Sequence, residues 1–457
     1  MEKNEIKNAV LLVSVITSFL TAFLGSSVNV ALPSIQKDFH IDAVSLAWIS
    51  SSYLLATASI LLPFGRLSDI IGRKKTFLWG LVFFTFFSFL CAFSPNIYIL
   101  ILLRIFQGVG AAMIFSTSTA IITSVFQPGE RGKAMGYSVS AVYFGLTFGP
   151  AFGGILTYHF GWHSIFVLNL PIGIFIAYLV QIKLKDTEWA DSKGEKFDWT
   201  GSLLYILGLS SLMLGFTRIQ SHFGKISLVV SIVILVVFLV FENKTKYPII
   251  PVNIFLKNIT FTFSNISALI NYSATFAVGF LLSLYLQYIK GFTPQTAGFI
   301  LAIQPVTQAI FSSFAGRLSD KIEPRYVASF GMFLTAVGLF LLSFINFHTP
   351  LQYVIIAQIS LGLGFAFFSS PNTNAIMSSV EKRHYGVASA AVGTMRLVGQ
   401  TLSIGIVTMF FAIHLGGTKF AAHLFPKFIS LANSILLGFS IFCAIGIIAS
   451  LARGNIK

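Results

Sequence analysis

The chain has 457 residues, of which 55% are hydrophobic and only 10% are charged, whereas soluble domains carry about 25% charged residues. This composition excludes an ordinary cytosolic enzyme. The formal net charge is +15, but the basic residues are scattered between apolar stretches and form no patch of the kind that binds nucleic acid. Cys91 and Cys443 both lie in apolar stretches and offer neither a disulfide framework nor a metal-binding spacing. We therefore expect no metal, no cofactor and no nucleic-acid partner.

Apolar stretches recur along the whole chain. A membrane-spanning helix needs about 20 mostly apolar residues, and the sequence contains fourteen such stretches separated by short polar loops. Their predicted centres are Ser18, Leu55, Phe86, Met113, Phe144, Ile172, Gly208, Ile234, Ala274, Ala302, Thr335, Gly362, Thr394 and Ile441. We expect the first stretch to remain as a helix and not to be removed as a secretory signal. The predicted fold is an all-α polytopic membrane protein embedded in a lipid bilayer.

The loops differ in charge on the two sides of the predicted membrane. An even number of spans places both termini on one side, and the loops on that side hold most of the 30 lysines and arginines. Cytoplasmic loops carry such an excess. We therefore predict that both termini are cytoplasmic, in the plasma (inner) membrane of a prokaryote.

A short sequence repeats between the two halves of the chain. Residues 65–69 read Gly-Arg-Leu-Ser-Asp, and residues 316–320 read the same, after the second and the tenth predicted spans. The repeat predicts two six-helix bundles with two additional helices between them. The predicted domains are residues 1–185, 186–257 and 258–457. The charged stretch between the sixth and seventh spans, residues 183–193, is expected to be a mobile cytoplasmic linker.

Four local patterns occur in a fixed order. Residues 65–75 read GRLSDIIGRKK, residues 104–112 read RIFQGVGAA, residues 145–154 read GLTFGPAFGG, and residues 162–173 read WHSIFVLNLPIG. Together they resemble the major facilitator superfamily, and within it the fourteen-helix drug:proton antiporter branch. The resemblance covers essentially the whole chain. It implies export of a small-molecule substrate by alternating access between two pseudo-symmetric bundles, with protons as the coupling ion and no obligate protein partner.

The third pattern contains Gly145, Gly149, Pro150, Gly153 and Gly154. Glycines spaced in this way remove side chains from a helix face and let another backbone approach closely, and a proline weakens the helix so that it can bend. The residues alone predict a close-packed, bendable helix, and static packing without bending is the alternative. The resemblance implies a seam between the bundles that limits leakage of the coupling ion.

The repeated loop contains acidic and basic residues that could join helix ends. Asp69, Arg73 and Asp320 are the candidates for such a gating clasp, although exposed ion pairs contribute only about 0 to 1 kcal/mol and a solvated loop is the alternative. In the second copy Pro324 and Arg325 replace the Gly-Arg-Lys run. We expect the second clasp to be weaker.

Two arginines lie inside predicted helices. Burying a guanidinium in a membrane helix costs about 2.5 to 3.5 kcal/mol on insertion scales, so Arg104 and Arg396 each need a partner or a water-lined cavity. The resemblance ties the position of Arg104 to proton movement. For Arg396 a substrate-binding role and a structural bond to helix-end carbonyls both remain open.

The acidic residues depart from the pattern of the branch. All fifteen lie in loops or near helix ends, and Leu24 occupies the position where related cation exporters carry an aspartate in the run D-x-T-x-x-N-V-A-L-P. This predicts a neutral or anionic amphipathic substrate. Proton coupling would then use the region of Asp69 and Arg104, a histidine such as His414, or the titration of the substrate itself.

Polar side chains inside the apolar stretches outline a substrate cavity. The candidates are Asn29, Tyr53, Gln107, Asn271, Tyr272, Gln304, Gln308, Asn372, Asn374, Arg396 and Gln400. Each amide could instead form an interhelical hydrogen bond.

The alternative to a proton-coupled exporter is a facilitator or importer of a neutral or anionic solute. The sequence contains no ATP-binding G-x-x-x-x-G-K-[ST] pattern and no clustered catalytic residues, so we expect neither a pump driven by ATP nor an enzyme.

Overall fold

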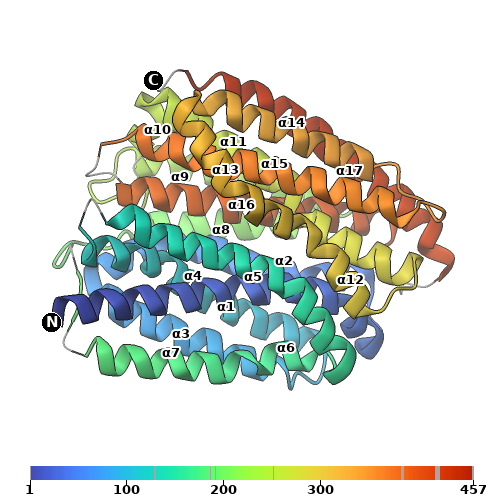
Figure 1. Cartoon of the computed structure of the whole chain (residues 1–457), viewed down its shortest axis with the longest axis horizontal. Helices are drawn as coiled ribbons and strands as arrows, with labels where there is room; N and C mark the ends of the chain where they lie inside the picture. The colour runs from blue at the N-terminus through green and yellow to red at the C-terminus, as the bar shows by residue number, and fades with distance from the viewer. Residues whose placement is uncertain are drawn as a thin grey trace.

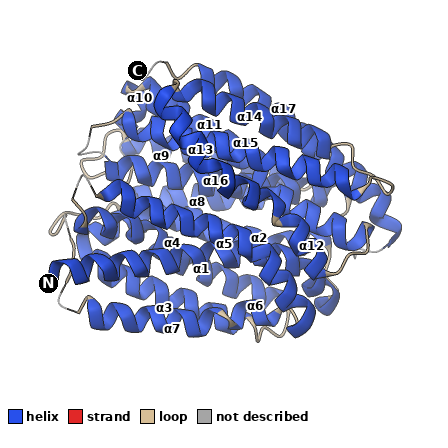
Figure 2. Ribbon diagram, viewed as in Figure 1, coloured by secondary structure: helices blue, strands red, loops and turns tan. Residues whose placement is uncertain are grey.

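The computed structural model describes residues 2–127, 130–185, 187–190, 192–250, 252–381, 385–416 and 422–454. Within these ranges the regular secondary structure is helical and no strand occurs (Figure 2). The same ranges contain 14 helices that are long and apolar enough to cross a membrane. Each predicted centre lies inside one of them, so the predicted all-α fold with fourteen spans is confirmed.

The first six spans form one group of helices. They comprise α1 (Glu2–Phe39), α2 (Ala43–Ile71), α3 (Arg73–Cys91), α4 (Ile97–Val125), α5 (Arg131–Phe160), and the short α6 (His163–Val167) followed by α7 (Asn169–Lys183). Local side chains set where helices begin. Asp42 accepts hydrogen bonds from the backbone N–H groups of Val44 and Ser45 at the start of α2, and Asn96 does the same for Ile99 in α4.

Two helices follow that the repeat does not account for. They are α8 (Trp199–Thr217) and α9 (His222–Glu242). Helix α8 packs against α9 and also against α2 and α16, so it touches both halves of the molecule. Helix α9 exposes a broad apolar surface that includes Val229, Ile232 and Val236. Such a surface fits contact with lipid acyl chains.

The last six spans form the second group. After the short α10 (Val252–Lys257) come α11 (Ile259–Leu284), a π-helical turn (Tyr285–Ile289), α12 (Pro294–Leu301), α13 (Ile303–Lys321), α14 (Pro324–Leu342), α15 (Leu351–Ser378), α16 (Tyr385–His414) and α17 (Phe425–Leu451). Helices α12 and α13 together form the tenth span. The predicted domain boundaries at residues 185 and 257 remain predictions.

The helices lie side by side, and both chain ends are found at the same end of the molecule, on the left in Figure 1. We call this end the terminal face and the other end the opposite face. The loops after α2, α4 and α7 lie at the terminal face, and the loops after α1, α3 and α5 lie at the opposite face. The assignment of the terminal face to the cytoplasm remains a prediction.

Glycines bring equivalent helix pairs together in the two halves. In the first half, a Cβ on Gly80 would stand 2.6 Å from Met113 Cβ, and one on Gly110 would stand 2.5 Å from the Phe84 amide nitrogen. In the second half, a Cβ on Gly364 would stand 2.6 Å from the Thr335 amide nitrogen. Helices α3 and α4, and likewise α14 and α15, therefore pack backbone against backbone.

The linker between α7 and α8 differs from the expectation of a mobile segment. Its described residues are hydrogen-bonded to the loop between α2 and α3, with Trp189 O accepting from Arg73 N at 2.8 Å and Asp69 O accepting from Ser192 N at 3.0 Å. The physical reason is that a helix start carries unpaired N–H groups. Glu188 supplies their acceptor, because its carboxylate receives the backbone N–H groups of Lys74 at 2.9 Å and Lys75 at 3.2 Å.

Candidate functional site

Arg104 is buried in α4 and its partners are all uncharged. The residue is 1% exposed. Its Nε donates to the Ile49 carbonyl oxygen at 3.1 Å, and its Nη1 donates to Gln107 Oε1 at 2.6 Å. The guanidinium carbon lies 4.3 Å from the centroid of the Tyr53 ring, within cation–π range. Carbonyl dipoles and an aromatic face therefore stabilise this charge, and the described part of the chain places no carboxylate against it.

Two polar atoms beside Arg104 are buried without a hydrogen-bond partner among the described residues. They are Gln107 Nε2 and Tyr53 Oη. A buried polar atom without a partner lowers the stability of the folded protein, because it has lost its hydrogen bonds to water. The structure thus brings three of the predicted residues, Tyr53, Arg104 and Gln107, into one polar group between α2 and α4.

A second polar group lies where the two halves meet. Tyr143 of α5 and Ser369 of α15 are joined by a hydrogen bond of 3.1 Å between their hydroxyl oxygens. Tyr272, Gln308 and Arg396 are electrostatic neighbours of the Tyr143 hydroxyl. Three of these five residues were predicted from the sequence, and they come from α11, α13 and α16.

Arg396 is half-buried at this boundary. Its guanidinium carbon lies 5.8 Å from the ring centroid of Phe115, which belongs to α4 in the other half. Tyr272 stacks at a tilt on Phe365, with ring centroids 5.9 Å apart. We call the six residues Phe115, Tyr143, Tyr272, Gln308, Ser369 and Arg396 the central cluster. It combines a cation, hydroxyl groups, an amide and aromatic faces contributed by both halves.

Sequence reasoning missed three members of the central cluster. Phe115 is one of 49 phenylalanines in the chain, and nothing in its neighbours sets it apart. Tyr143 and Ser369 likewise stand in no distinctive pattern. The signal that could have found Tyr143 is its position two residues before Gly145, on the helix predicted to form the seam.

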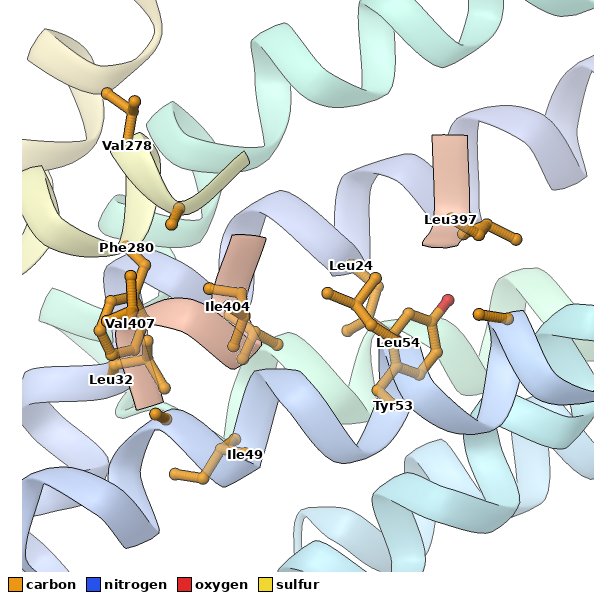
Figure 3. Packing of buried hydrophobic residues seen from close by; sticks show 14 of the residues in the cluster. Leu24, Leu32, Ile49, Tyr53, Leu54, Val278, Phe280, Leu397, Ile404 and Val407 are labelled. Carbon is orange, nitrogen blue, oxygen red and sulfur yellow. The ribbon is translucent and has the colours of Figure 1, made fainter. Parts of the chain in front are cut away.

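The position of the missing acid is occupied by a tightly packed leucine. Leu24 is 0% exposed and belongs to the buried apolar cluster of the molecule. Figure 3 draws it among side chains of α2 and α16, including Tyr53, Leu54, Leu397 and Ile404. Asn29, five residues further along α1, accepts a hydrogen bond of 3.3 Å from Ser50.

Two predicted cavity residues contact neighbouring helices of the second half. Asn271 lies beside Cys443 of α17. Asn372 accepts a hydrogen bond of 2.9 Å from Arg453 and donates one of 3.2 Å to the Ser264 carbonyl oxygen. Arg453 is 0% exposed, although it lies just after the last residue of α17, where exposure to water is the usual outcome. Burial lowers the pKa of its guanidinium to about 10, which leaves it charged at neutral pH.

The remaining predicted cavity residues are more dispersed. Asn374 donates to Ser319 Oγ at 3.4 Å, near the terminal face and next to the second copy of the repeat. Gln304 and Gln400 are half-buried on α13 and α16.

The glycine-rich helix α5 is in close contact on two sides. A Cβ on Gly145 would stand 2.5 Å from the Phe19 carbonyl oxygen of α1, and one on Gly153 would stand 2.6 Å from Ser27 Cβ. A Cβ on Gly154 would instead stand 2.5 Å from the Pro294 carbonyl oxygen of α12 in the other half. Successive helix positions point about 100° apart. The adjacent glycines therefore allow close contact with two different helices, Gly153 with α1 and Gly154 with α12.

Hydrogen bonds also join the two halves at the opposite face. Gln287 Nε2 donates to the Val30 carbonyl oxygen at 2.9 Å, and Tyr288 Oη donates to Gln36 Oε1 at 2.6 Å. Together with the contact between α5 and α12, these bonds hold the halves together at this face.

The first copy of the repeated loop holds an ion pair at the terminal face, and its role as a gating clasp remains a prediction. Arg73 pairs with Asp69 at 2.7 Å and donates to Ser124 Oγ of α4 at 2.5 Å. Arg66 pairs with Glu195 of the linker and donates to Ser192 Oγ at 3.0 Å. In the second copy the side chain of Asp320 lies outside the described residues, so its clasp remains a prediction.

Comparison with known proteins assigns the family. The sequence profile of the Major Facilitator Superfamily matches residues 14–242 and 265–454. The chain belongs to this superfamily. It is therefore a membrane transporter and not an enzyme, and the resemblance seen in the sequence motifs is confirmed.

Curated relatives within the superfamily include drug-resistance proteins. The chain is 33% identical to the riboflavin transporter RibZ of Clostridioides difficile over 96% of each chain. It is 28% identical to the multidrug resistance protein Stp of Mycobacterium tuberculosis, covering 88% of this chain and 74% of the relative. Identity to the puromycin resistance protein pur8 of Streptomyces alboniger is 29%, over 87% of this chain and 80% of the relative.

A solved structure shares the fold. A bacterial homolog of the human lysosomal transporter Spinster, in an inward-facing and unoccupied conformation, superposes with a TM-score of 0.70 over 98% of this chain and 97% of its own. The sequences are 15% identical, so this likeness concerns the fold alone.

Proposed function

We propose that this superfamily member exports small amphipathic molecules by alternating access, in exchange for protons. The observation that carries the proposal is the central cluster, because it gathers side chains of both halves around one half-buried guanidinium. A site at the boundary between two bundles changes its access when the bundles rock against each other. The multidrug and puromycin resistance relatives support export.

The contacts between the halves suggest which parts move. Opening of the opposite face would break the bonds Gln287–Val30 and Tyr288–Gln36 and separate α5 from α12. Closure of the terminal face would bring the loops of the two repeats together. With the basic loops in the cytoplasm, the opposite face is the external one, and a substrate would leave through it.

The chemistry of the central cluster favours a neutral or anionic amphipathic substrate. Arg396 offers a cation, and Phe115 and Tyr272 offer flat apolar faces, as in sites that hold a small molecule by burial and a few polar anchors. A cationic drug would need a buried anion, and Leu24 fills the position where related exporters carry one. Asp69, Arg73 and Arg104 are the proposed coupling and gating residues.

Transport in everted membrane vesicles tests this proposal. We expect an anionic dye to accumulate when a pH gradient is imposed and to leak out when the gradient is collapsed. A lipophilic cation should not accumulate. Strong pH-driven accumulation of the cation alone would contradict the assigned substrate class.

Variants of Arg396 test the site itself. Arg396→Gln should lower dye accumulation about tenfold or more, because a charge-assisted hydrogen bond contributes about 1.5 to 3 kcal/mol, whereas Arg396→Lys keeps the charge and part of the activity. Arg218→Gln is the matched control, since Arg218 is exposed at the opposite face. Equal accumulation in all three variants would contradict a role of Arg396 in binding.

A facilitator or importer of a neutral or anionic solute is the second candidate. It is favoured by the lack of a carboxylate against Arg104 in the described part of the chain, and by the relative that is named a riboflavin transporter. The vesicle assay separates the two functions, because the flux of a facilitator would persist unchanged after collapse of the pH gradient.

A further inference from the structure

Two carboxyl groups meet at the terminal ends of α8 and α9. Asp198 directly precedes α8, and Glu242 is the last residue of α9. One oxygen of each group has a backbone donor, since Asp198 Oδ1 accepts from Gly201 N at 2.8 Å and Glu242 Oε2 accepts from Ile250 N at 3.0 Å. Glu242 is 2% exposed. A carboxyl group that is more than nine-tenths buried thus lies outside both the Arg104 group and the central cluster.

The other two carboxyl oxygens point to the same place. Glu242 Oε1 and Asp198 Oδ2 are both buried, and neither has a donor among the described residues. A Cβ on Gly201 would collide with Glu242 Oε1 and would stand 2.5 Å from Asp198 Oδ2, so both oxygens lie against the same backbone position. The absence of a side chain at Gly201 is what allows them to converge. Two ionised oxygens cannot form a hydrogen bond, whereas one protonated and one ionised oxygen can.

No cation compensates this pair among the residues that the structure describes. Lys196, two residues before Asp198, is exposed, and so are Lys244 and Lys246 in the loop after α9. Of the helices that pack on α8, α2 contributes Arg66, which is paired with Glu195 and lies 6.0 Å from the ring centroid of Tyr247. Helix α16 contributes Arg396, which lies over Phe115. Two like charges held close together in a buried place cannot both ionise readily.

We infer that Asp198 and Glu242 share one proton, and that the terminal ends of α8 and α9 thereby form a proton-binding site. The proton is covalently bound to one carboxyl oxygen and donated to the facing oxygen of the other. Its release gives two carboxylates and one proton to the water at the terminal face, which the half-buried Asp198 adjoins. The site stands apart from the proposed transport site and holds whether or not the protein exports drugs.

Infrared spectroscopy of the purified full-length protein at neutral pH tests the inference. We expect a carboxylic acid C=O stretching band that shifts in heavy water. The band should be lost in Glu242→Gln and in Asp198→Asn, because an amide donates to the remaining carboxylate in place of the proton. The control Glu5→Gln, at an exposed residue of α1, should keep it.

Thermal unfolding gives a second measurement that does not depend on the band. Raising the pH removes the shared proton and leaves two buried charges, so the melting temperature of the parent should fall from mildly acidic to mildly alkaline pH. The melting temperature of Glu242→Gln should fall less than that of the parent over this range. The inference would be overturned if the parent protein lacked the band. It would also be overturned if both single variants retained the band.

Discussion

Adding one methyl group at Gly154 should weaken the closure of the opposite face. In the observed arrangement the Cβ of an alanine at this position would stand 2.5 Å from the Pro294 carbonyl oxygen and 3.1 Å from Gln295 Cα. Both atoms belong to the backbone of the other half, so no side chain can turn away. The two halves must separate to admit the methyl group.

The cost of this separation can be estimated. Overpacking a close contact costs about 1 to 3 kcal/mol, and the contact exists only while α5 and α12 touch. A free-energy difference of that size changes the ratio of two conformations about 5- to 150-fold. We therefore expect Gly154→Ala to shift the population toward states in which the opposite face is open.

Distance measurements between two spin labels can report this shift. Tyr98 of α4 is 78% exposed and Phe347, in the loop after α14, is 44% exposed, and both lie at the opposite face in different halves. Labelled cysteines at these two positions should give a longer mean distance in Gly154→Ala than in the parent. The native Cys91 and Cys443 are buried and should not react.

Gly136→Ala provides the matched control on the same helix. A Cβ at Gly136 would meet nothing within 4 Å, so this variant should give the parental distances. Identical distance distributions for Gly154→Ala and Gly136→Ala would refute the argument that backbone contact between α5 and α12 holds this face closed.

Two further predictions concern buried or clasped charges. Glu188→Gln should speed tryptic cleavage of the linker at Lys193. A neutral acceptor loses about 0.3 to 1 kcal/mol of interaction with the start of α3. Cleavage at the parental rate would show that the linker is held by its other contacts. Asn372→Leu should lower stability by about 1.5 to 3 kcal/mol, since it leaves the charged Arg453 without its amide partner, and the loss should be smaller when Arg453→Leu is already present. Thermal unfolding of the two single variants and the double variant checks this, and strictly additive losses would contradict it.

The sequence predicted the spans well because their signal is local. Each span is a long apolar stretch, and membrane burial of backbone polar groups allows few alternatives to a helix. The contact between Arg104 and Gln107 is also local, since they lie one helical turn apart, but the sequence indicated Gln107 only as a cavity residue and left the partner of Arg104 open. The central cluster was harder to predict, because Tyr143 and Ser369 come together only when two distant helices meet.

The buried positions of charged residues were also not visible in the sequence. Arg453 and Glu242 lie at helix ends, where exposure to water is the usual outcome, yet both are almost fully buried by neighbours from other helices. The linker was expected to be mobile because its composition is charged and polar. Its structure depends on Gly72, whose φ of +118° and missing side chain leave room for the Glu188 carboxylate.

Gly153 and Gly154 of α5 should tolerate different substitutions among homologues. A methyl group on Gly153 would stand 2.6 Å from Ser27 Cβ and 2.9 Å from Ser27 Cα, so only a glycine at position 27 would remove the nearer contact. A methyl group on Gly154 would meet only main-chain atoms of α12, which no substitution can shrink. Across homologues, position 153 should therefore covary with position 27, whereas position 154 should remain glycine whatever its neighbours become.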